Sequence, residues 1–317
     1  MDRSAFLALT AAAATVPGFA LAQTPPSLTQ VRVASAPDED ILGALWAQQS
    51  GIFRRYGLDV HVQPMNSGAA VGAAVVGGSV DIGKSSLVSL ITAHTRGIPL
   101  VLIASAGEYN AKAPVVGMLV KKGSPIKTAR DLDGKTLSVP SLNDQFSIAI
   151  KAWMDQHGGD SSTVKFVELP NSSVPQAIED GRIDAASIGN PILSAALDSG
   201  KVQLIGHTFD AIAPRFILAC YFTTSDYARK NRDVVERFAK AVAESGAYCN
   251  AHQDATVELL SSFTKVSPQT IRHMTRTTIG TILDPRLIQP VIDAAAKYKA
   301  IPAAFDARDM IAPYLRT

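Results

Sequence analysis

Along the chain, segments in which apolar and polar positions alternate are followed by segments in which apolar positions recur every three to four residues. This pattern predicts a regular succession of strands and helices. In the first half we expect strands at 31–35, 57–65, 79–83 and 98–106, and helices at 40–51, 67–78 and 85–97. Such alternation is typical of a parallel sheet that is covered by helices. The first half therefore predicts one α/β unit.

The second half repeats this order 103 residues further on. "SAP" at 35–37 returns as "SVP" at 138–140, and "GSVDI" at 78–82 returns as "GRIDA" at 181–185. The other elements expected here are a helix at 141–159, a strand at 164–169, a helix at 173–181 and a helix at 190–200 with Asn190 as its cap. Equal spacing predicts two similarly wound lobes rather than a solenoid.

Two β-type segments, 114–123 and 214–231, lead from one unit to the other and back. Two crossings of this kind form a double hinge, which lets lobes close over a ligand. The predicted division is lobe 1 at 29–117 with 222–317, lobe 2 at 118–221, and hinges near 114–120 and 215–223.

The first residues predict export. Arg3 precedes the apolar run "AFLALTAAAATV", and Ala20-Leu21-Ala22 is a small-x-small cleavage signal. We expect a signal peptide at 1–22, cleavage after about Ala22, and a periplasmic location. The general export route is favoured over the twin-arginine route, since only one arginine is present, and no later stretch reaches about 18 uninterrupted apolar residues.

Composition excludes several classes of protein. A formal charge of +2 without a basic run argues against a nucleic-acid partner. The six histidines show no metal-ligand spacing, so we expect no metal and no cofactor. Cys220 and Cys249 fit an exported protein that does not depend on disulfides, and whether they pair stays open.

The stretch "GSVDIGKSS" at 78–86 fits the pattern of a phosphate-binding loop. The residues before Gly78 have helical spacing, however, and Val80-Asp81-Ile82 alternates like a strand. Its counterpart at 183–185 has no Gly-Lys-Ser after it. We interpret the match as coincidental, with Lys84 at a strand end.

Ligands of open α/β sheets bind beyond the carboxyl ends of the strands, where helix N-termini present free N–H groups. Four segments have this character: 36–39, 84–86, 141–144 and 189–191. Two come from each unit, so facing lobes would bring them to one cleft. Each serine or asparagine there has a second interpretation as a helix cap.

The chain resembles the substrate-binding proteins of nitrate, sulfonate and taurine-type ABC importers, which are related to thiamine-pyrimidine synthases. The resembling segments are "GIFRRYGLDV" (51–60), "GGSVDIG" (77–83), "GIPLVLIAS" (97–105), "VGMLVKKGSPIKTARDLDGKTLSVP" (116–140), "AIEDGRIDAASIGNP" (177–191) and "RDVVERFAKAVAESGAY" (232–248). The resemblance implies a type II periplasmic-binding-protein fold, in which each lobe is a mostly parallel sheet flanked by helices. It also implies a monomer without chemistry of its own, which captures a solute and delivers it to a membrane permease.

Ligand contacts follow from the resemblance position by position. They are Pro37, Asp38, Ser67, Gly68, Ser85, Ser86, Tyr109, Asn110, Ser141, Asn143, Asp144, Asn190 and Arg215. The matching residues Gly78, Asp81, Gly181 and Asp184 are expected to be structural, as a tight helix-to-strand turn and its polar tether.

The charge of the solute is less determined than the site. Helix N-termini, Lys84 and Arg215 favour a small organic anion such as a sulfonate or carboxylate. Acidic residues in the same loops, Asp38, Glu39, Glu108 and Asp144, would favour an amine or a polar heterocycle if they face the cleft.

Two other functions share this scaffold. One is an enzyme like the pyrimidine synthases or a desulfinase, and the other is a ligand sensor for a membrane receptor. No Gly-x-Ser-x-Gly motif occurs, and neither Cys220 nor Cys249 falls at a strand-to-helix turn. We therefore expect a binding protein and not an enzyme.

Overall fold

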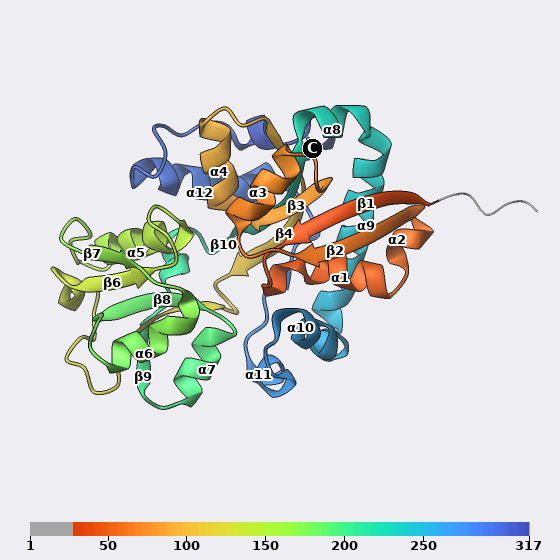
Figure 1. Ribbon diagram of the computed structural model, residues 1–317. Coiled ribbons are helices and arrows are strands. Elements are labelled where there is room, and N and C mark those ends of the chain that lie inside the picture. Colours follow the sequence, from red (N-terminus) through yellow and green to blue (C-terminus); the bar gives the residue numbers. More distant parts are fainter. Residues whose placement is uncertain (1–27, 317) are drawn as a thin grey trace, which may run out of the picture.

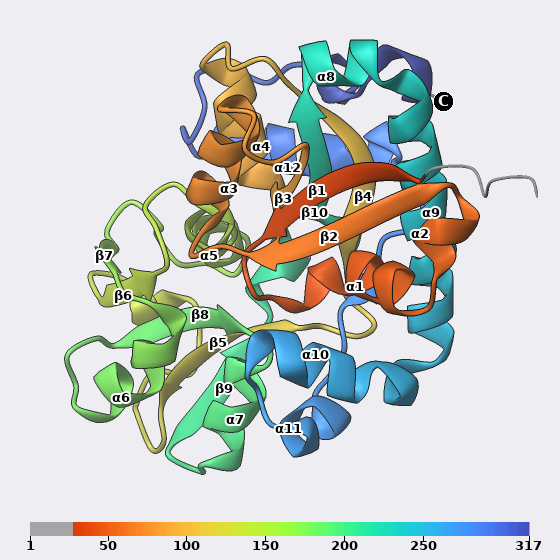
Figure 2. The same ribbon diagram turned by 45° about the vertical axis from the view of Figure 1, so that its right-hand side comes forward.

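The computed structural model describes residues 28–316 as two bodies side by side, joined by two crossing segments (Figures 1 and 2). The signal-peptide prediction for 1–22 lies outside the described residues. Ala111 N donates to Pro214 O (2.9 Å), so the outgoing and returning crossings lie next to each other. The chain passes between the bodies at about 111–115 and 207–214.

Lobe 1 is built from both ends of the chain. Its strands are β1 (Thr29–Ser35), β2 (Leu58–Pro64), β3 (Ile82–Ser86), β4 (Leu100–Asn110), β10 (Arg215–Thr224) and β11 (Thr278–Ile279). Its helices are α1 (Leu42–Gln49), α2 (Ile52–Arg55), α3 (Gly68–Val76), α4 (Leu87–Thr95), α8 (Ser225–Lys230), α9 (Arg232–Ala251), α10 (Val257–Thr264), α11 (Pro268–His273) and α12 (Pro285–Lys297).

Lobe 2 is continuous in sequence. Its strands are β5 (Val116–Lys121), β6 (Thr136–Val139), β7 (Lys165–Glu168), β8 (Ala185–Gly189) and β9 (Val202–Gly206). Its helices are α5 (Gln145–Gln156), α6 (Val174–Glu179) and α7 (Ile192–Asp198).

Five strands have the same order in the two sheets, β2-β1-β3-β10-β4 in lobe 1 and β7-β6-β8-β5-β9 in lobe 2. In lobe 1, β11 adds a sixth strand beside β4. In each sheet three neighbouring strands are parallel and the strand entering from the other lobe, β10 or β5, is antiparallel to its neighbours. The predicted fold of two similarly wound units is confirmed: in each sheet four strands run the same way, and the crossing strand, together with β11 in lobe 1, runs the opposite way.

The repeated glycine and aspartate positions perform the same task in both lobes. Asp81 accepts from Arg32 N (2.8 Å) through its side chain, and Asp184 accepts from Thr136 N (2.8 Å) in the same way. Gly78 and Gly181 precede these tethers with φ of 72° and 70°, a left-handed conformation that favours glycine. Their predicted structural role is confirmed.

The predicted lobe boundaries need correction at the return strand. All of β10 from Arg215 pairs with β3 and β4 of lobe 1, whereas the prediction assigned 215–221 to lobe 2. Likewise β5 begins at Val116 in the lobe 2 sheet. The cause is that each crossing strand is apolar apart from residues at its ends, so its sequence does not reveal which sheet it joins.

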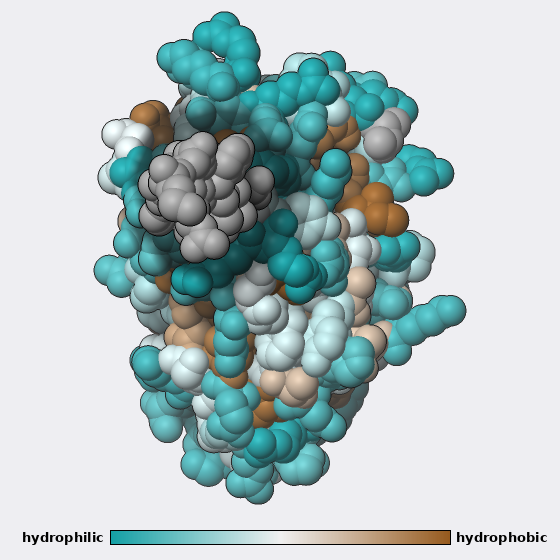
Figure 3. All heavy atoms as spheres, turned by 90° about the vertical axis from the view of Figure 1, so that its right-hand side faces the viewer, coloured by the Kyte–Doolittle hydropathy of each residue, from teal (hydrophilic) through white to brown (hydrophobic). Residues whose placement is uncertain are grey.

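The core is divided between the lobes and the crossings. One apolar cluster fills the space between the lobe 1 sheet and α1 and α9, and two others fill lobe 2. A further cluster runs from α4 and α12 to the crossings and to Ile148 and Ala149 of α5, and so joins the lobes. The face of the molecule in Figure 3 is mostly hydrophilic with scattered apolar residues. Of the helices in residues 28–316, none has both the length and the apolar character that a membrane crossing requires.

Candidate solute-binding site at the facing strand ends

The carboxyl ends of three lobe 1 strands lie together. Ser35 at the end of β1 pairs with Pro64 of β2 on one side and with Lys84 of β3 on the other. The last residues of these strands and the segments that follow them are therefore neighbours. They contain the predicted contacts Pro37, Asp38, Ser67, Gly68, Ser85 and Ser86.

Direct contacts confirm this proximity. A methyl group at Gly68, the first residue of α3, would overlap the Ser85 hydroxyl, so the two residues lie in close contact and the hydroxyl would have to move aside. Ser67 and Ser86 cap α3 and α4: Ser67 Oγ accepts from Ala70 N (3.2 Å), and Ser86 Oγ accepts from Ser89 N (3.4 Å). Both helices thus begin at this edge of the sheet, with their partial positive charge directed toward it.

Lys84 is enclosed by two carboxylates. Its ammonium group pairs with Asp38 and Asp40, and its side chain is only 2% exposed. Burial alone would lower the pKa of Lys84, but the two carboxylates outweigh that effect and raise it. Lys84 is therefore a charged residue whose charge is already neutralised, and it does not offer a free cation to an anionic solute.

The two carboxylates differ in their surroundings. Burial and the neighbouring Asp40 raise the pKa of Asp38 well above its usual value, in spite of Lys84. Burial acts to raise the pKa of Asp40 too, but Lys84 and the hydrogen bond with Asp38 lower it. The Asp38 side chain stays 49% exposed, whereas that of Asp40 is 16% exposed. Asp38 is thus the carboxylate of this trio that can meet a solute.

The lobe 2 edge carries caps instead of ion pairs. Asp144 Oδ1 accepts from Ser147 N (2.8 Å) and caps α5, and Asp144 Oδ2 accepts from Ser141 N (3.3 Å). Asn143 adopts a left-handed conformation (φ 61°) in this turn, and Ser141 and Asn143 are exposed. Burial raises the pKa of Asp144 to about 6, although the N–H donors oppose the rise.

Asn190 shows that the two edges face each other. It follows β8, the neighbour of β6, and its Nδ2 donates to Thr275 O of lobe 1 (2.8 Å). Its Oδ1 accepts from Ser194 N (3.1 Å) in the first turn of α7, although the N-cap of that helix is Pro191 and not Asn190 as predicted. The strand ends of lobe 2 are therefore turned toward lobe 1.

Tyr109, Asn110 and Arg215 lie at the crossings. Tyr109 is fully buried, its hydroxyl donates to Asp210 (2.6 Å), and its ring packs on Phe216 with centroids 5.2 Å apart. The structure places it in the hinge core and not on a solute-facing surface, because strand β4 is buried almost to its end. Asn110 Oδ1 accepts from Lys112 N (3.0 Å) in the turn that follows.

Arg215 is held by a buried acid. Its Nε donates to Glu108 Oε2 (2.8 Å), and the Arg215 side chain remains 54% exposed while that of Glu108 is 1% exposed. Burial raises the pKa of Glu108, although the Arg215 guanidinium opposes that shift. Part of the Arg215 guanidinium is thus open to a ligand at the base of the crossings.

Sequence reasoning missed Asp40 and the buried pair of Glu39 and Arg276. Glu39 and Arg276 side chains are each 5% exposed, and Thr277 N also donates to Glu39 Oε2 (2.9 Å). These partners are more than 200 residues apart in sequence, and an acidic residue next to a strand end looks exposed in a linear pattern. No pattern of residues along the sequence indicates that Glu39 and Arg276 form a pair.

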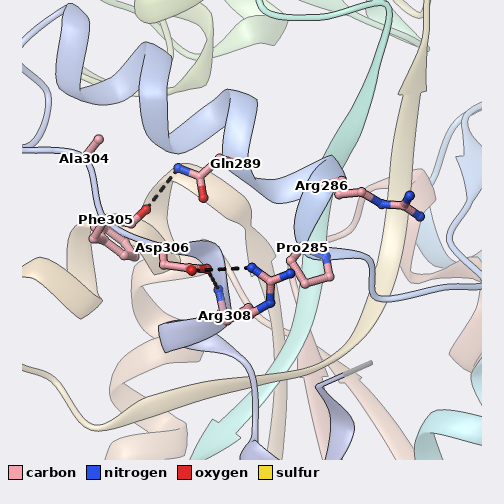
Figure 4. A pocket seen from close by; sticks show the side chains of 7 residues that line it. All are labelled: Pro285, Arg286, Gln289, Ala304, Phe305, Asp306 and Arg308. Atoms are coloured by element: carbon pink, nitrogen blue, oxygen red, sulfur yellow. Dashed lines mark hydrogen bonds and ion pairs between the residues drawn. The ribbon is translucent and has the colours of Figure 1, made fainter.

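A surface pocket lies away from the strand ends. It is lined by Pro285, Arg286, Gln289, Ala304, Phe305, Asp306 and Arg308, beside the start of α12 (Figure 4). Its polar groups already have partners: Gln289 Nε2 donates to Phe305 O (3.0 Å), Arg308 pairs with Asp306 (3.4 Å), and Arg286 pairs with Asp284 (2.6 Å) outside the pocket. None of the predicted contacts lines this pocket.

The titratable groups give no sign of metal or thiol chemistry. Within residues 28–316, no three His, Cys, Asp or Glu side chains are grouped so that they could hold a metal ion. Cys220 and Cys249 are both free and buried. Burial raises the pKa of both thiols, that of Cys249 to about 11, which is opposite to what a nucleophilic cysteine requires.

Several curated proteins are similar in sequence. A chain of Brucella abortus that is provisionally named a binding protein is 24% identical over 270 residues, 84% of this chain and 80% of that one. The taurine-binding periplasmic protein of Escherichia coli is 26% identical over 70% of this chain and 67% of its own. An enzyme is also similar: the yeast 4-amino-5-hydroxymethyl-2-methylpyrimidine phosphate synthase THI13 is 24% identical over 64% of this chain and 61% of its own.

Solved structures show the same fold. The periplasmic aliphatic sulphonate binding protein SsuA from Escherichia coli superposes with a TM-score of 0.74 at 22% identity, covering 91% of this chain and 92% of that one. The periplasmic nitrate-binding protein NrtA from Synechocystis gives 0.73 at 14% identity, over 90% and 86%. The predicted periplasmic-binding-protein fold is confirmed. The NMT1/THI5-like family model matches residues 38–256, and the chain belongs to that family.

Proposed function

We propose that this protein is the extracytoplasmic solute-binding component of an ABC importer. It captures a small polar solute between the strand ends of its two lobes and delivers it to membrane permease subunits. A cleaved signal peptide, a periplasmic location and a monomeric state belong to the same proposal. Relatives named as taurine-binding and sulphonate-binding periplasmic proteins support it.

The observation that carries the proposal is the facing of the two strand edges. Asp38 and Ser85 lie at one edge, Ser141 and Asp144 lie at the other, and Asn190 joins the second edge to lobe 1. Ligands of open α/β sheets bind at such edges. Two edges that face each other across a double crossing give the solute contacts from both lobes.

We infer that the solute carries an anionic group such as a sulfonate or carboxylate. The N-termini of α3 and α4 and the exposed part of Arg215 are the groups that favour it. Lys84 does not contribute a free charge, since Asp38 and Asp40 neutralise it.

A second solute chemistry is favoured by one observation. Asp38 is half exposed, and it shares the single cation Lys84 with a second carboxylate, Asp40. An amine or a polar heterocycle with N–H donors would supply the missing partner. A compound with an anionic group at one end and an amine at the other would satisfy both sets of residues.

The described residues offer the enzyme alternative no reactive cysteine. Both thiols are buried with raised pKa values, and the hydroxyl of Tyr109 is occupied by Asp210. Incubating the purified protein with each compound that binds and searching for new masses tests this directly. Consumption of the compound would contradict a receptor without chemistry.

A thermal-shift screen of the mature protein tests the function. The panel contains nitrate, alkyl- and arylsulfonates, carboxylates, amines, pyrimidines and compounds that carry both charges. A solute present at about 100 times its dissociation constant adds about 2.7 kcal/mol to the free energy of unfolding. That increment corresponds to a rise of a few degrees in the melting temperature for a protein of this size.

A pair of matched variants locates the binding. Ser141→Trp fills the space at the lobe 2 edge and is expected to abolish the shift, whereas Ser162→Trp, exposed in the same lobe on another turn, is expected to retain it. We choose Ser141 over Ser85 because Ser85 is buried against Gly68 and leaves no room for an indole. An unchanged shift in Ser141→Trp would remove this edge from the site.

A further inference from the structure

Asn190 is bonded to three different parts of the molecule. Its backbone N donates to Val115 O in the first crossing (2.9 Å), and its Oδ1 accepts from Ser194 Oγ (2.7 Å) and Ser194 N (3.1 Å) at the start of α7. Its Nδ2 donates to Thr275 O of lobe 1 (2.8 Å). Asn190 is thus hydrogen-bonded to the hinge, to a lobe 2 helix and to the opposite lobe.

The Thr275 segment is fixed within lobe 1. The next residue, Arg276, is buried and pairs with Glu39, and its guanidinium also donates to Thr256 Oγ1 (3.2 Å) and Gln253 O (3.3 Å). A charge pair with this many additional donors and acceptors holds its backbone in one place. The acceptor of the Asn190 amide is therefore a rigid part of lobe 1.

This rigid part leads directly to the candidate site. Glu39 accepts from Thr277 N (2.9 Å) and follows Asp38, the half-exposed carboxylate at the end of β1. The Asn190 bond therefore links the lobe 2 strand edge to the segment that carries Asp38. The neighbouring elements agree, since α7 of lobe 2 packs on α11 of lobe 1, the helix just before Thr275 (Figures 1 and 2).

We propose that Asn190 is a latch that holds the two lobes in the arrangement described, and that it acts on solute binding as a positioning residue rather than as a ligand contact. The proposal goes beyond solute capture and rests only on the two-lobed fold, not on which solute binds. A two-state equilibrium between lobe arrangements is shifted by any contact made in one state only. A net hydrogen bond between neutral groups changes such a population roughly fivefold.

Asn190→Asp separates the latch from the bonds to Ser194. An aspartate keeps the oxygen that accepts from Ser194 N and Ser194 Oγ. At pH 7.5 it has no donor for Thr275 O and sets a negative charge against that oxygen, so the contact between the lobes is lost. Ser194→Ala is the matched control, because it removes one bond to Asn190 and leaves the bond to Thr275 in place.

The distance between the lobes is measured by pulsed electron–electron spin resonance on the ligand-free protein. Spin labels are attached at Arg54→Cys in lobe 1 and Lys165→Cys in lobe 2, both exposed, while the native cysteines are buried. We expect Asn190→Asp to raise the population with the longer distance roughly fivefold. We expect Ser194→Ala to keep the distribution of the labelled parent.

Two results would overturn the proposal. One is a distance distribution in Asn190→Asp that overlays that of the parent, and the other is an equal change in Ser194→Ala. Circular dichroism at the measuring temperature establishes that each variant is folded. If Asn190→Asp does not fold, Asn190→Ser replaces it, since a serine is too short to reach Thr275 O.

Discussion

The strand edges of the two lobes have the same topology but different chemistry. In lobe 1 the edge is built on buried charges: Lys84 is enclosed by Asp38 and Asp40, and Glu39 pairs with Arg276. In lobe 2 the corresponding edge is held by the cap of α5 and by the Asn190 amide. Lobe 1 thus supports its edge with ion pairs, whereas lobe 2 supports its edge with neutral donors that bond to the carboxylates of Asp144 and Glu168.

The difference indicates that the two strand edges have different roles in solute binding. Buried ion pairs fix the geometry of the lobe 1 edge, because each member loses its partner if the segment moves. A helix cap contributes less stability than a buried ion pair, and it joins residues that are close in the sequence. The polar groups of the lobe 2 edge can therefore change partners when a solute binds. We therefore expect lobe 1 to present a preformed surface and lobe 2 to adapt to it.

The largest effect is expected from Lys84→Met. This change leaves Asp38 and Asp40 side by side without their cation, and removing one member of a buried pair costs about 3–5 kcal/mol. We expect about 3 kcal/mol at pH 7, because Asp38 is partly exposed. Urea unfolding measures the loss, which should shrink at pH 4 as the carboxylates take up protons.

The matched control is Lys201→Met in lobe 2. The Lys201–Glu179 pair (2.9 Å) has a lysine side chain that is 60% exposed, and exposed pairs contribute about 0–1 kcal/mol. Equal losses in the two lysine variants would contradict the contrast between buried and exposed charges.

A smaller and pH-dependent effect is expected at Asp144. Its pKa in the folded protein is about 6, above its ordinary value of 3.8, so between these values the folded state binds more protons than the unfolded chain. The free energy of unfolding contributed by this group therefore falls as the pH rises through that window. In Asp144→Asn, which keeps the cap, we expect this fall to disappear.

Urea unfolding of both proteins between pH 4 and pH 7 measures the difference. The advantage of Asp144→Asn over the unaltered protein should grow across this range. Parallel profiles for the two proteins would mean that the Asp144 carboxyl titrates normally. Asp144→Ala, which loses the cap, should be about 1 kcal/mol less stable than Asp144→Asn at either end.

The smallest effect distinguishes two glycines of α3. Gly68→Ala displaces the Ser85 hydroxyl and should be neutral or slightly destabilising. Gly72→Ala, in the same helix with open space around it, should be stabilising by roughly 0.5–1 kcal/mol. Thermal unfolding measures both, and a larger gain for Gly68→Ala than for Gly72→Ala would contradict the close approach at the lobe 1 edge.

The fold was predictable from the sequence where the pattern is local. Alternating segments, and the recurrence of "GSVDI" as "GRIDA", predict two units with equal tethers at Asp81 and Asp184. The strand ends followed from the same reasoning. The sheet to which β10 belongs was not predictable, because an apolar strand that enters a sheet from another lobe has no pattern of its own.

The site was predictable in outline only. Position after a strand end identifies Asp38, Ser85 and Asp144, but not whether a charge is free or already paired. Whether a charge is paired depends on contacts between segments that are far apart in the sequence, such as Arg276 with Glu39. Whether a side chain is exposed depends on how the whole strand packs, as the full burial of Tyr109 in β4 shows. A sequence pattern indicates which side of a helix or strand is exposed. It does not indicate which residues of other elements form contacts with that helix or strand.

The most direct test of the central claim is a crystal structure of the protein with a solute that stabilises it in the screen. The account predicts that the solute touches the lobe 1 segments 36–38, 67–68 or 85–86 and also the lobe 2 segment 141–144. A solute bound to one lobe alone, or in the surface pocket beside α12, would contradict it.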